Sequence, residues 1–146
     1  ELGTGSGYQA AILSPLCRMV YTVERHKPLL AQAEERFKTL HLRNIVTRHG
    51  DGMKGWPEAA PFDRILLSAA VSEVPQILID QLKPGGILIA PVGGDAQSAR
   101  GVSQSLTKIV KGEHGTERED LLPVMFVPMI EGLPRDARKP DEPGKT

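Results

Sequence analysis

The chain has 146 residues, the size of one domain, and its 40% content of hydrophobic residues suffices for one packed core. Its 18 basic and 18 acidic residues balance, which speaks against nucleic acid or an anionic membrane as a partner. No apolar run approaches the ~20 residues that span a bilayer. Cys17 is the only cysteine, so an internal disulfide is excluded and a reducing, cytoplasmic location is expected. We interpret Cys17 as a small buried residue near the end of a helix.

Segments typical of strands alternate with segments typical of helices along the first two thirds of the chain. Helices are expected at 8–13, 28–40 and 75–82, and strands at 19–23, 45–47, 62–67 and 87–92. The last two strands are apolar enough to be buried on both faces. A loop is expected at 53–61 and a turn at 83–86. This order predicts an α/β fold with a doubly wound, mostly parallel sheet.

The two ends of the chain differ from this pattern. Residues 1–3 are typical of the last residues of a strand, so we expect a fragment whose first strand is largely missing, and which alone folds poorly and has little activity. Strands at 105–110 and 121–127 around a turn at 112–115 predict a C-terminal antiparallel hairpin. We expect one domain over 1–130 and a disordered tail over 131–146, which is rich in proline and charge.

Three glycines, Gly3, Gly5 and Gly7, follow the first residues at every second position. A dinucleotide fingerprint needs a third glycine where this chain has Tyr8, and the Gly-Lys-Ser/Thr of a phosphate loop is absent. The loop therefore favours a ligand without phosphate groups, such as a short zwitterionic chain.

Two acidic residues follow the next two strands. Glu24 lies about 20 residues beyond the loop, where a carboxylate can accept both ribose hydroxyls, and Asp51 lies between two glycines, where it can accept from an exocyclic amine. Each alone is a common surface or turn residue. Together with the loop they predict a site for S-adenosylmethionine, an adenosine with an amino-acid tail.

The chain resembles the protein-L-isoaspartate O-methyltransferase family in a series of motifs that runs to about Met129. In chain order the motifs lie at 1–11, 20–25, 49–52, 55–57, 60–63, 74–75, 81–86, 91–93, 119–124 and 126–129. The resemblance implies the Rossmann-like fold of class I S-adenosylmethionine-dependent methyltransferases. It also implies protein repair, in which the α-carboxylate of L-isoaspartyl residues in damaged proteins and peptides is methylated.

The resemblance also implies the site residues. The cofactor-binding residues would be Glu1, Gly3, Thr4, Gly5, Gly7, Glu24, Arg25, Asp51 and Gly52. The strand ends beside the peptide would be Ala69, Ala70, Phe126 and Val127, although the two alanines could be small because a helix packs on them. The family's functional serine would lie upstream of Glu1, so no catalytic residue is expected within this chain.

Other interpretations stay open. A methyltransferase of the same fold could act on a small molecule or RNA, although neutral charge and 4% aromatic residues speak against nucleic acid. The chain could also be an inactive fragment or a non-catalytic binding module. The four histidines lack metal-ligand spacing, so no metal is expected, and we expect a monomer without nucleic-acid or membrane partners.

Overall fold

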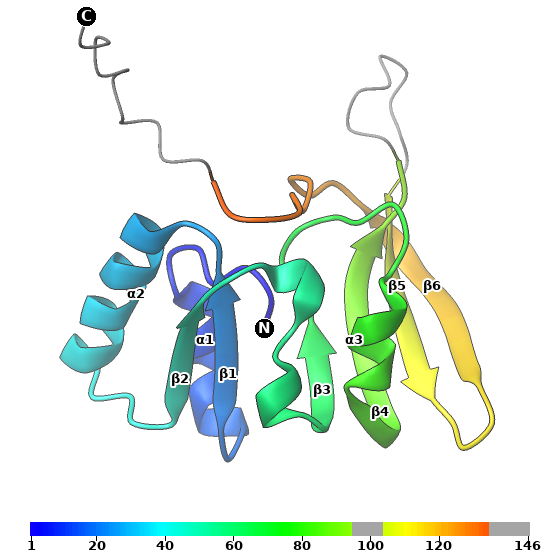
Figure 1. The fold of residues 1–146 in the computed structure, drawn as a ribbon, viewed down its shortest axis with the longest axis horizontal. Helices are drawn as coiled ribbons and strands as arrows, with labels where there is room; N and C mark the ends of the chain where they lie inside the picture. Colours follow the sequence, from blue (N-terminus) through cyan, green and yellow to red (C-terminus); the bar gives the residue numbers. More distant parts are fainter. Residues whose placement is uncertain (95–103, 135–146) are drawn as a thin grey trace, which may run out of the picture.

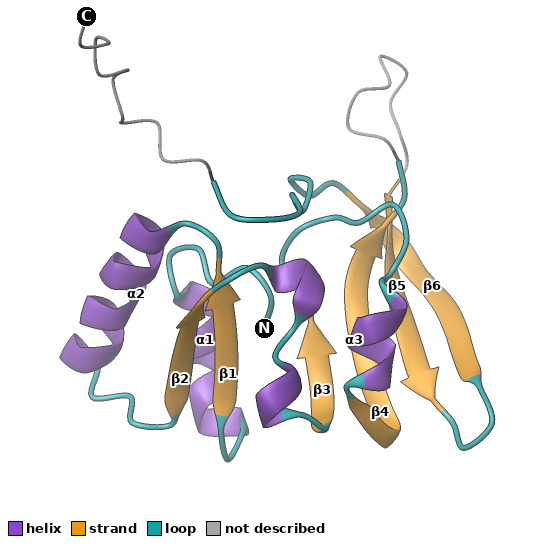
Figure 2. Ribbon diagram, viewed as in Figure 1, coloured by secondary structure: helices purple, strands orange, loops and turns teal. Residues whose placement is uncertain are grey.

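A computed structural model describes residues 1–94 and 104–134 of the chain. These residues contain three α-helices and six strands, and helices and strands are interspersed as far as β4, as expected for an α/β fold (Figures 1 and 2). The helices are α1 (Tyr8–Leu13), α2 (Lys27–Thr39) and α3 (Gln76–Asp80). The strands are β1 (Val20–Glu24), β2 (Ile45–His49), β3 (Phe62–Leu66), β4 (Leu82–Val92), β5 (Gln104–Lys111) and β6 (Thr116–Val124).

The strands form two ladders that a single residue joins. β1 pairs in parallel with β2, and β3 pairs in parallel with β4, which continues antiparallel to β5 and β6. Leu2 bridges Val23 of β1 and also Leu67, directly after β3, in parallel with both. The spatial order is therefore β2, β1, Leu2, β3, β4, β5, β6. The α/β sheet with its C-terminal antiparallel hairpin is confirmed, but the sheet is mixed, with two parallel and two antiparallel strand pairs, and among the described residues Leu2 alone bridges β1 and the end of β3.

Two apolar clusters pack around this sheet. One contains Ala10, Val20, Ala33 and Phe37, from α1, β1 and α2. The larger cluster joins α3 to the inner strands through Leu78, Leu82, Leu88 and their neighbours. Figure 1 shows α1 behind β1 and α3 in front of β4, so helices cover both faces. No helix among the described residues is long and apolar enough to cross a membrane.

The bounds and the buried face of α2 follow from the spacing of its apolar residues and the position of its proline. Leu30, Ala33 and Phe37 are buried at helical spacing, and Pro28 occupies the first turn, where its missing N–H has no partner to lose. The helix begins and ends one residue before the predicted bounds.

Several expectations were wrong in detail. The expected turn at 83–86 lies inside β4, where the four residues between Leu82 and Ile87 oppose the single residue between Phe62 and Arg64. Gly85 has a φ of 77°, so the glycines form an irregularity within the strand. The expected helix at 75–82 is a helix of only five residues, α3.

Exposure also differs from expectation. Asp63 and Arg64 of β3 are exposed, so only the end of that strand is buried. Cys17 is exposed after the 3₁₀ turn Ser14–Leu16, because the chain there has already left α1. In the hairpin, β6 begins at Thr116 and ends at Val124, so it starts earlier than expected and leaves 125–127 outside it.

The expected loop at 53–61 contains two 3₁₀ turns, Gly52–Lys54 and Pro57–Ala59. The side chain of Gln81 hydrogen-bonds to the backbone of this loop. The Gln81 side chain accepts from Trp56 N at 2.8 Å and donates to Lys54 O at 2.9 Å. The Trp56 ring meets Tyr21 edge to face at a centroid distance of 5.3 Å. Within the expected tail, residues 131–134 form no helix or strand, and 135–146 lie outside the described residues.

Candidate cofactor site

The sequence-predicted site residues gather at the carboxyl ends of the parallel strands. Gly3 follows the central bridge, Glu24 ends β1, and Asp51 follows β2 (upper edge of the sheet in Figure 1). The ends are in direct contact, because Gly50 N donates to Glu24 O at 3.0 Å and Gly3 N donates to Val23 O at 2.9 Å. Ligands of open α/β sheets bind at this edge, where the strand order reverses.

The glycine loop needs glycine at each position for its backbone, but the three positions differ in their surroundings. Gly3, Gly5 and Gly7 have φ values of 99°, 54° and 85°, which other residues rarely adopt. A Cβ on Gly7 would lie 2.8 Å from the Phe37 ring, so Gly7 allows close packing against α2. A Cβ on Gly5 would meet no atom within 4 Å. Gly5 therefore faces open space that a ligand could occupy.

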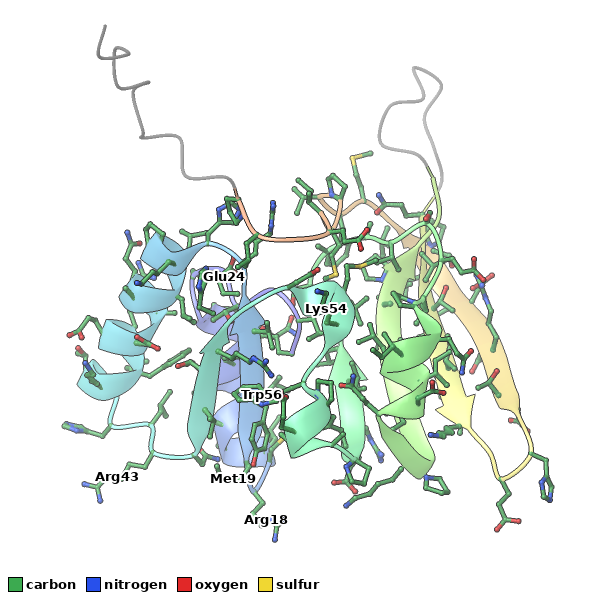
Figure 3. The ribbon with its side chains drawn as sticks, in the orientation of Figure 1. Arg18, Met19, Glu24, Arg43, Lys54 and Trp56 are labelled. Atoms are coloured by element: carbon green, nitrogen blue, oxygen red, sulfur yellow. The ribbon has the colours of Figure 1, made fainter. Side chains whose placement is uncertain are left out.

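Glu24 holds the loop to β1. Its Oε2 accepts from Gly5 N at 2.8 Å and its Oε1 accepts from His26 N at 2.9 Å, and the residue is 5% exposed (Figure 3). A carboxylate has about four acceptor positions, so both oxygens can take a further donor such as a hydroxyl. The predicted ribose acceptor is thus also the residue that shapes the loop.

A buried polar cluster lies beneath the loop. Thr4 and Thr22 share a hydroxyl hydrogen bond of 2.6 Å, and the Thr22 hydroxyl also donates to Glu1 Oε2 at 2.6 Å. Burial raises the pKa of the Glu1 carboxyl above its ordinary value. Glu1 Oε1 and Ser68 Oγ are buried, and neither has a hydrogen-bond partner among the described residues. The Ser68 hydroxyl lies close enough to the Glu1 carboxyl to offset part of this rise in its pKa.

Asp51 is both a turn residue and an anchor. Its Oδ1 accepts from Met53 N at 2.9 Å, which caps a 3₁₀ turn, and its Oδ2 accepts from Gly132 N at 2.9 Å. Arg25 donates through Nε to Gly132 O at 3.0 Å. Arg25 and Asp51 together hold the segment around Gly132 across the strand ends. The side chain of Arg25 is therefore engaged with this segment.

The Asp51→Asn substitution should release this segment. The new amide keeps an acceptor for Met53 N–H, but its NH₂ group then faces the N–H of Gly132, where two donors meet. A hydrogen bond to a charged group contributes about 1.5–3 kcal/mol, so we expect hydrogen exchange at the Gly132 amide to rise roughly tenfold or more. Asp63→Asn, at an exposed carboxylate of β3, is the control. Unchanged exchange at Gly132 would show that the contact does not hold the segment.

The predicted substrate residues also meet. Ala70 N donates to Val127 O at 2.8 Å, and Met129 N donates to Ala70 O at 2.7 Å. Ala70 is buried, whereas Val127 is 72% exposed and Phe126 is 38% exposed. Gln104 fixes Phe126 by two hydrogen bonds to its backbone. This pairing places the exposed segment Phe126–Val127 beside Ala70. Ala69 precedes Ala70 in the sequence.

Sequence reasoning missed Ser68, Gly132 and Gln104. Ser68 stands just after a predicted strand, where a polar residue before two alanines was a usable signal. Gly132 and Gln104 carried no local signal, because their roles depend on contacts with residues far away in sequence. Among the described residues, no group of three or more His, Cys, Asp or Glu side chains could hold a metal ion.

Comparison with solved structures identifies the class of fold. A protein-L-isoaspartate O-methyltransferase structure superposes with a TM-score of 0.77 at 29% identity, covering 87% of this chain and 40% of that one. A Plasmodium falciparum structure described as a β-aspartate methyltransferase in complex with S-adenosyl-L-homocysteine has a TM-score of 0.70, also at 29% identity, covering 88% of this chain and 63% of that one. The fold is that of class I S-adenosylmethionine-dependent methyltransferases.

Sequence comparison gives the family. The family model described as Protein-L-isoaspartate(D-aspartate) O-methyltransferase matches residues 1–133. Protein-L-isoaspartate O-methyltransferases of Paramagnetospirillum magneticum (strain ATCC 700264 / AMB-1) and Parvibaculum lavamentivorans (strain DS-1) are 54% and 53% identical over 93% and 94% of this chain. The chain belongs to the protein-L-isoaspartate O-methyltransferase family. It spans 62% and 60% of the lengths of these two relatives.

Proposed function

We propose that the protein to which this chain belongs moves a methyl group from S-adenosylmethionine to the α-carboxylate of L-isoaspartyl residues in damaged proteins and peptides. Family membership supports this proposal. The structural observation that carries it is the gathering of Glu24, Asp51 and an open glycine loop at one edge of the sheet. Repair would follow because the ester can close to a succinimide, which can reopen to normal aspartate.

The residues present fit the cofactor. Gly5 opens onto free space, and the buried Glu1 carboxyl and Ser68 hydroxyl lie together beside the glycine loop. We propose that the loop and Glu1 hold the amino-acid part, that Glu24 accepts the ribose hydroxyls, and that Asp51 accepts the adenine amine. We further propose that Thr4 and Gly7 act through the shape of the loop, since Thr4 is buried against Thr22 and Gly7 against Phe37. Gly52 lies beside Leu2 and Met129 and completes the same edge.

The proposed reaction needs little acid–base chemistry from the chain. The cofactor would supply a methyl group already activated on a sulfonium. The acceptor carboxylate has a pKa near ~3.5 and is ionised at neutral pH, so no general base is required. The chain's residues would hold the reactants in line and keep water away. Such positioning can supply roughly 7–11 kcal/mol.

The exposed segment beside Ala70 supports a peptide substrate. Ala69 and Ala70 are small, and the backbone pairing of Ala70 with Val127 places Phe126 and Val127 at the same edge. We propose that a flexible isoaspartyl segment lies against these residues. We also propose one methyltransferase domain over 1–130, and a monomer that acts in the cytoplasm, where an exposed thiol such as Cys17 stays reduced.

Methyl transfer to matched peptides tests this function. An isoaspartyl peptide should be methylated, whereas its aspartyl twin of identical sequence should not be. The 146-residue chain is assayed beside the full-length Paramagnetospirillum magneticum relative, which is the positive control. Equal methylation of both peptides would contradict the proposal. Binding of S-adenosyl-L-homocysteine, measured separately by calorimetry, distinguishes a failed cofactor site from a wrong acceptor.

A further inference from the structure

Two of the sequence motifs, 55–57 and 81–86, contribute no residue to the candidate cofactor site, but they contact each other in the structure. Trp56 N donates to Gln81 Oε1 at 2.8 Å, and Gln81 Nε2 donates to Lys54 O at 2.9 Å. Gln81 is 6% exposed. In Figure 3, Lys54 lies nearer the cofactor edge of the sheet than Trp56 does. One buried side-chain amide therefore joins both ends of the stretch 54–56, which follows Asp51 closely in the chain.

The close approach of Gln81 to this stretch depends on Gly55. Gly55 is buried and has a φ of 61°, which other residues rarely adopt. An added Cβ would overlap Gln81 Oε1 and would stand 2.9 Å from Leu78 Cδ2. The glycine of the 55–57 motif thus makes room for the glutamine of the 81–86 motif.

The backbone of Gln81 is fixed by the core. Gln81 lies between the last residue of α3 and the first residue of β4, and its carbonyl accepts from Phe62 N at 2.8 Å. Its neighbours Leu78 and Leu82 are 0% and 1% exposed. A side chain that leaves such a fixed backbone can hold a loop that has no strand pairing of its own.

The stretch that Gln81 holds is continuous with the turn that presents Asp51. Lys54 N donates to Asp51 O at 3.2 Å, and Met53 N donates to Asp51 Oδ1 at 2.9 Å. Asp51 therefore caps the 3₁₀ turn whose last residue, Lys54, is bound to Gln81. The direction of the Asp51 carboxylate depends on this turn, and the turn depends on its attachment to Gln81.

We propose that Gln81 is a positioning residue for the adenine end of the cofactor site. It acts through the turn that begins at Asp51 and is not itself one of the residues proposed to bind the cofactor. This inference rests on the proposed function, in which Asp51 accepts the adenine amine. A glutamine suits the role because its amide supplies one donor and one acceptor here and brings no charge into a buried place.

Ligand selectivity tests the inference in variants of the full-length protein to which the chain belongs. Calorimetry measures the affinity for S-adenosyl-L-homocysteine and for its 6-oxo analogue S-inosyl-L-homocysteine, which lacks the amine. Gln81→Met keeps the length of the side chain and removes both hydrogen bonds. Gly55→Ala displaces the Gln81 amide by a second route. Gln76→Met changes an exposed glutamine of α3 and is the matched control.

The ratio of the two affinities separates positioning from loss of stability. Partial unfolding lowers the apparent affinity for both ligands by the same factor, so their ratio does not change. The wild type and Gln76→Met should prefer S-adenosyl-L-homocysteine by roughly tenfold or more, because its amine donates to a carboxylate. Gln81→Met and Gly55→Ala should reduce this preference severalfold.

Hydrogen exchange at the Met53 amide gives a readout that needs no ligand. This amide donates to Asp51 and not to Gln81, so its exchange should rise roughly tenfold in Gln81→Met only if the loss of Gln81 loosens the turn. Reduced selectivity with unchanged exchange at Met53 would overturn the route through the turn.

Undiminished selectivity in Gln81→Met would overturn the inference and leave the proposed function intact. A wild type that bound neither ligand would instead refute the proposed cofactor site, and the inference with it. A wild type that bound both ligands equally would remove Asp51 from the adenine amine, and Gln81 would then have no adenine contact to position.

Discussion

The Glu24→Ala substitution is expected to lower the affinity for S-adenosyl-L-homocysteine by at least tenfold and also to destabilise the chain. Glu24 accepts from Gly5 N at 2.8 Å and from His26 N at 2.9 Å while almost fully buried. Each hydrogen bond to a charged group contributes about 1.5–3 kcal/mol, and alanine would leave both N–H groups without an acceptor. Calorimetry measures the affinity, and urea unfolding measures the stability.

Two variants separate the roles of Glu24. Glu24→Gln keeps one acceptor oxygen and should lie between the wild type and the alanine variant in both measurements. Glu35→Ala removes a carboxylate from the exposed face of α2, where side-chain exposure is 72%, and should change neither. Loss of stability with unchanged affinity would leave Glu24 as a loop-shaping residue only.

The Gly7→Ala substitution is expected to destabilise the fold by roughly 2–5 kcal/mol. Alanine at a φ of 85° carries about 1–2 kcal/mol of backbone strain, and overpacking a core adds about 1–3 kcal/mol. The new Cβ would stand 2.8 Å from the Phe37 ring and 3.1 Å from Ala33 Cβ. Thermal or urea unfolding measures the change.

Gly5→Ala is the matched control for this effect. Gly5 has a φ of 54°, and its added Cβ would meet no atom within 4 Å, so only the backbone strain applies. The double substitution Gly7→Ala with Phe37→Leu should recover part of the packing cost. If Gly5→Ala and Gly7→Ala destabilised the chain equally, the contact between the loop and α2 would not be the cause.

Local patterns in the sequence predicted most of the elements. α2 follows from helical spacing of apolar residues with Pro28 in its first turn, and α1 was expected as the helix that follows the glycine loop. β1 and β2 follow from short β-branched runs. The glycine spacing predicted a loop, and the structure gives all three of its glycines positive φ values. The motif series gave the family, which the comparisons confirm. These features depend on residues close together in the chain, so the sequence carries them directly.

Other features needed the tertiary structure. The sequence placed Glu24 and Asp51 at strand ends but could not show that Gly5 and Gly132 donate to them, because Gly132 lies 81 residues beyond Asp51. The glycines after Lys83 were predicted to form a turn, but they lie within β4 because that strand pairs with β3 on both sides of them. Cys17 was expected to be buried and is exposed.

By itself, then, the sequence determined the alternation of elements and the family, and it predicted the residues of the candidate cofactor site. Only the tertiary structure decided which backbone N–H groups hydrogen-bond to those side chains, and that Leu2 bridges β1 and the residue after β3. The physical reason is that periodicity and turn preference act over a few residues, whereas hydrogen-bond partners and voids depend on strand register and packing between distant segments.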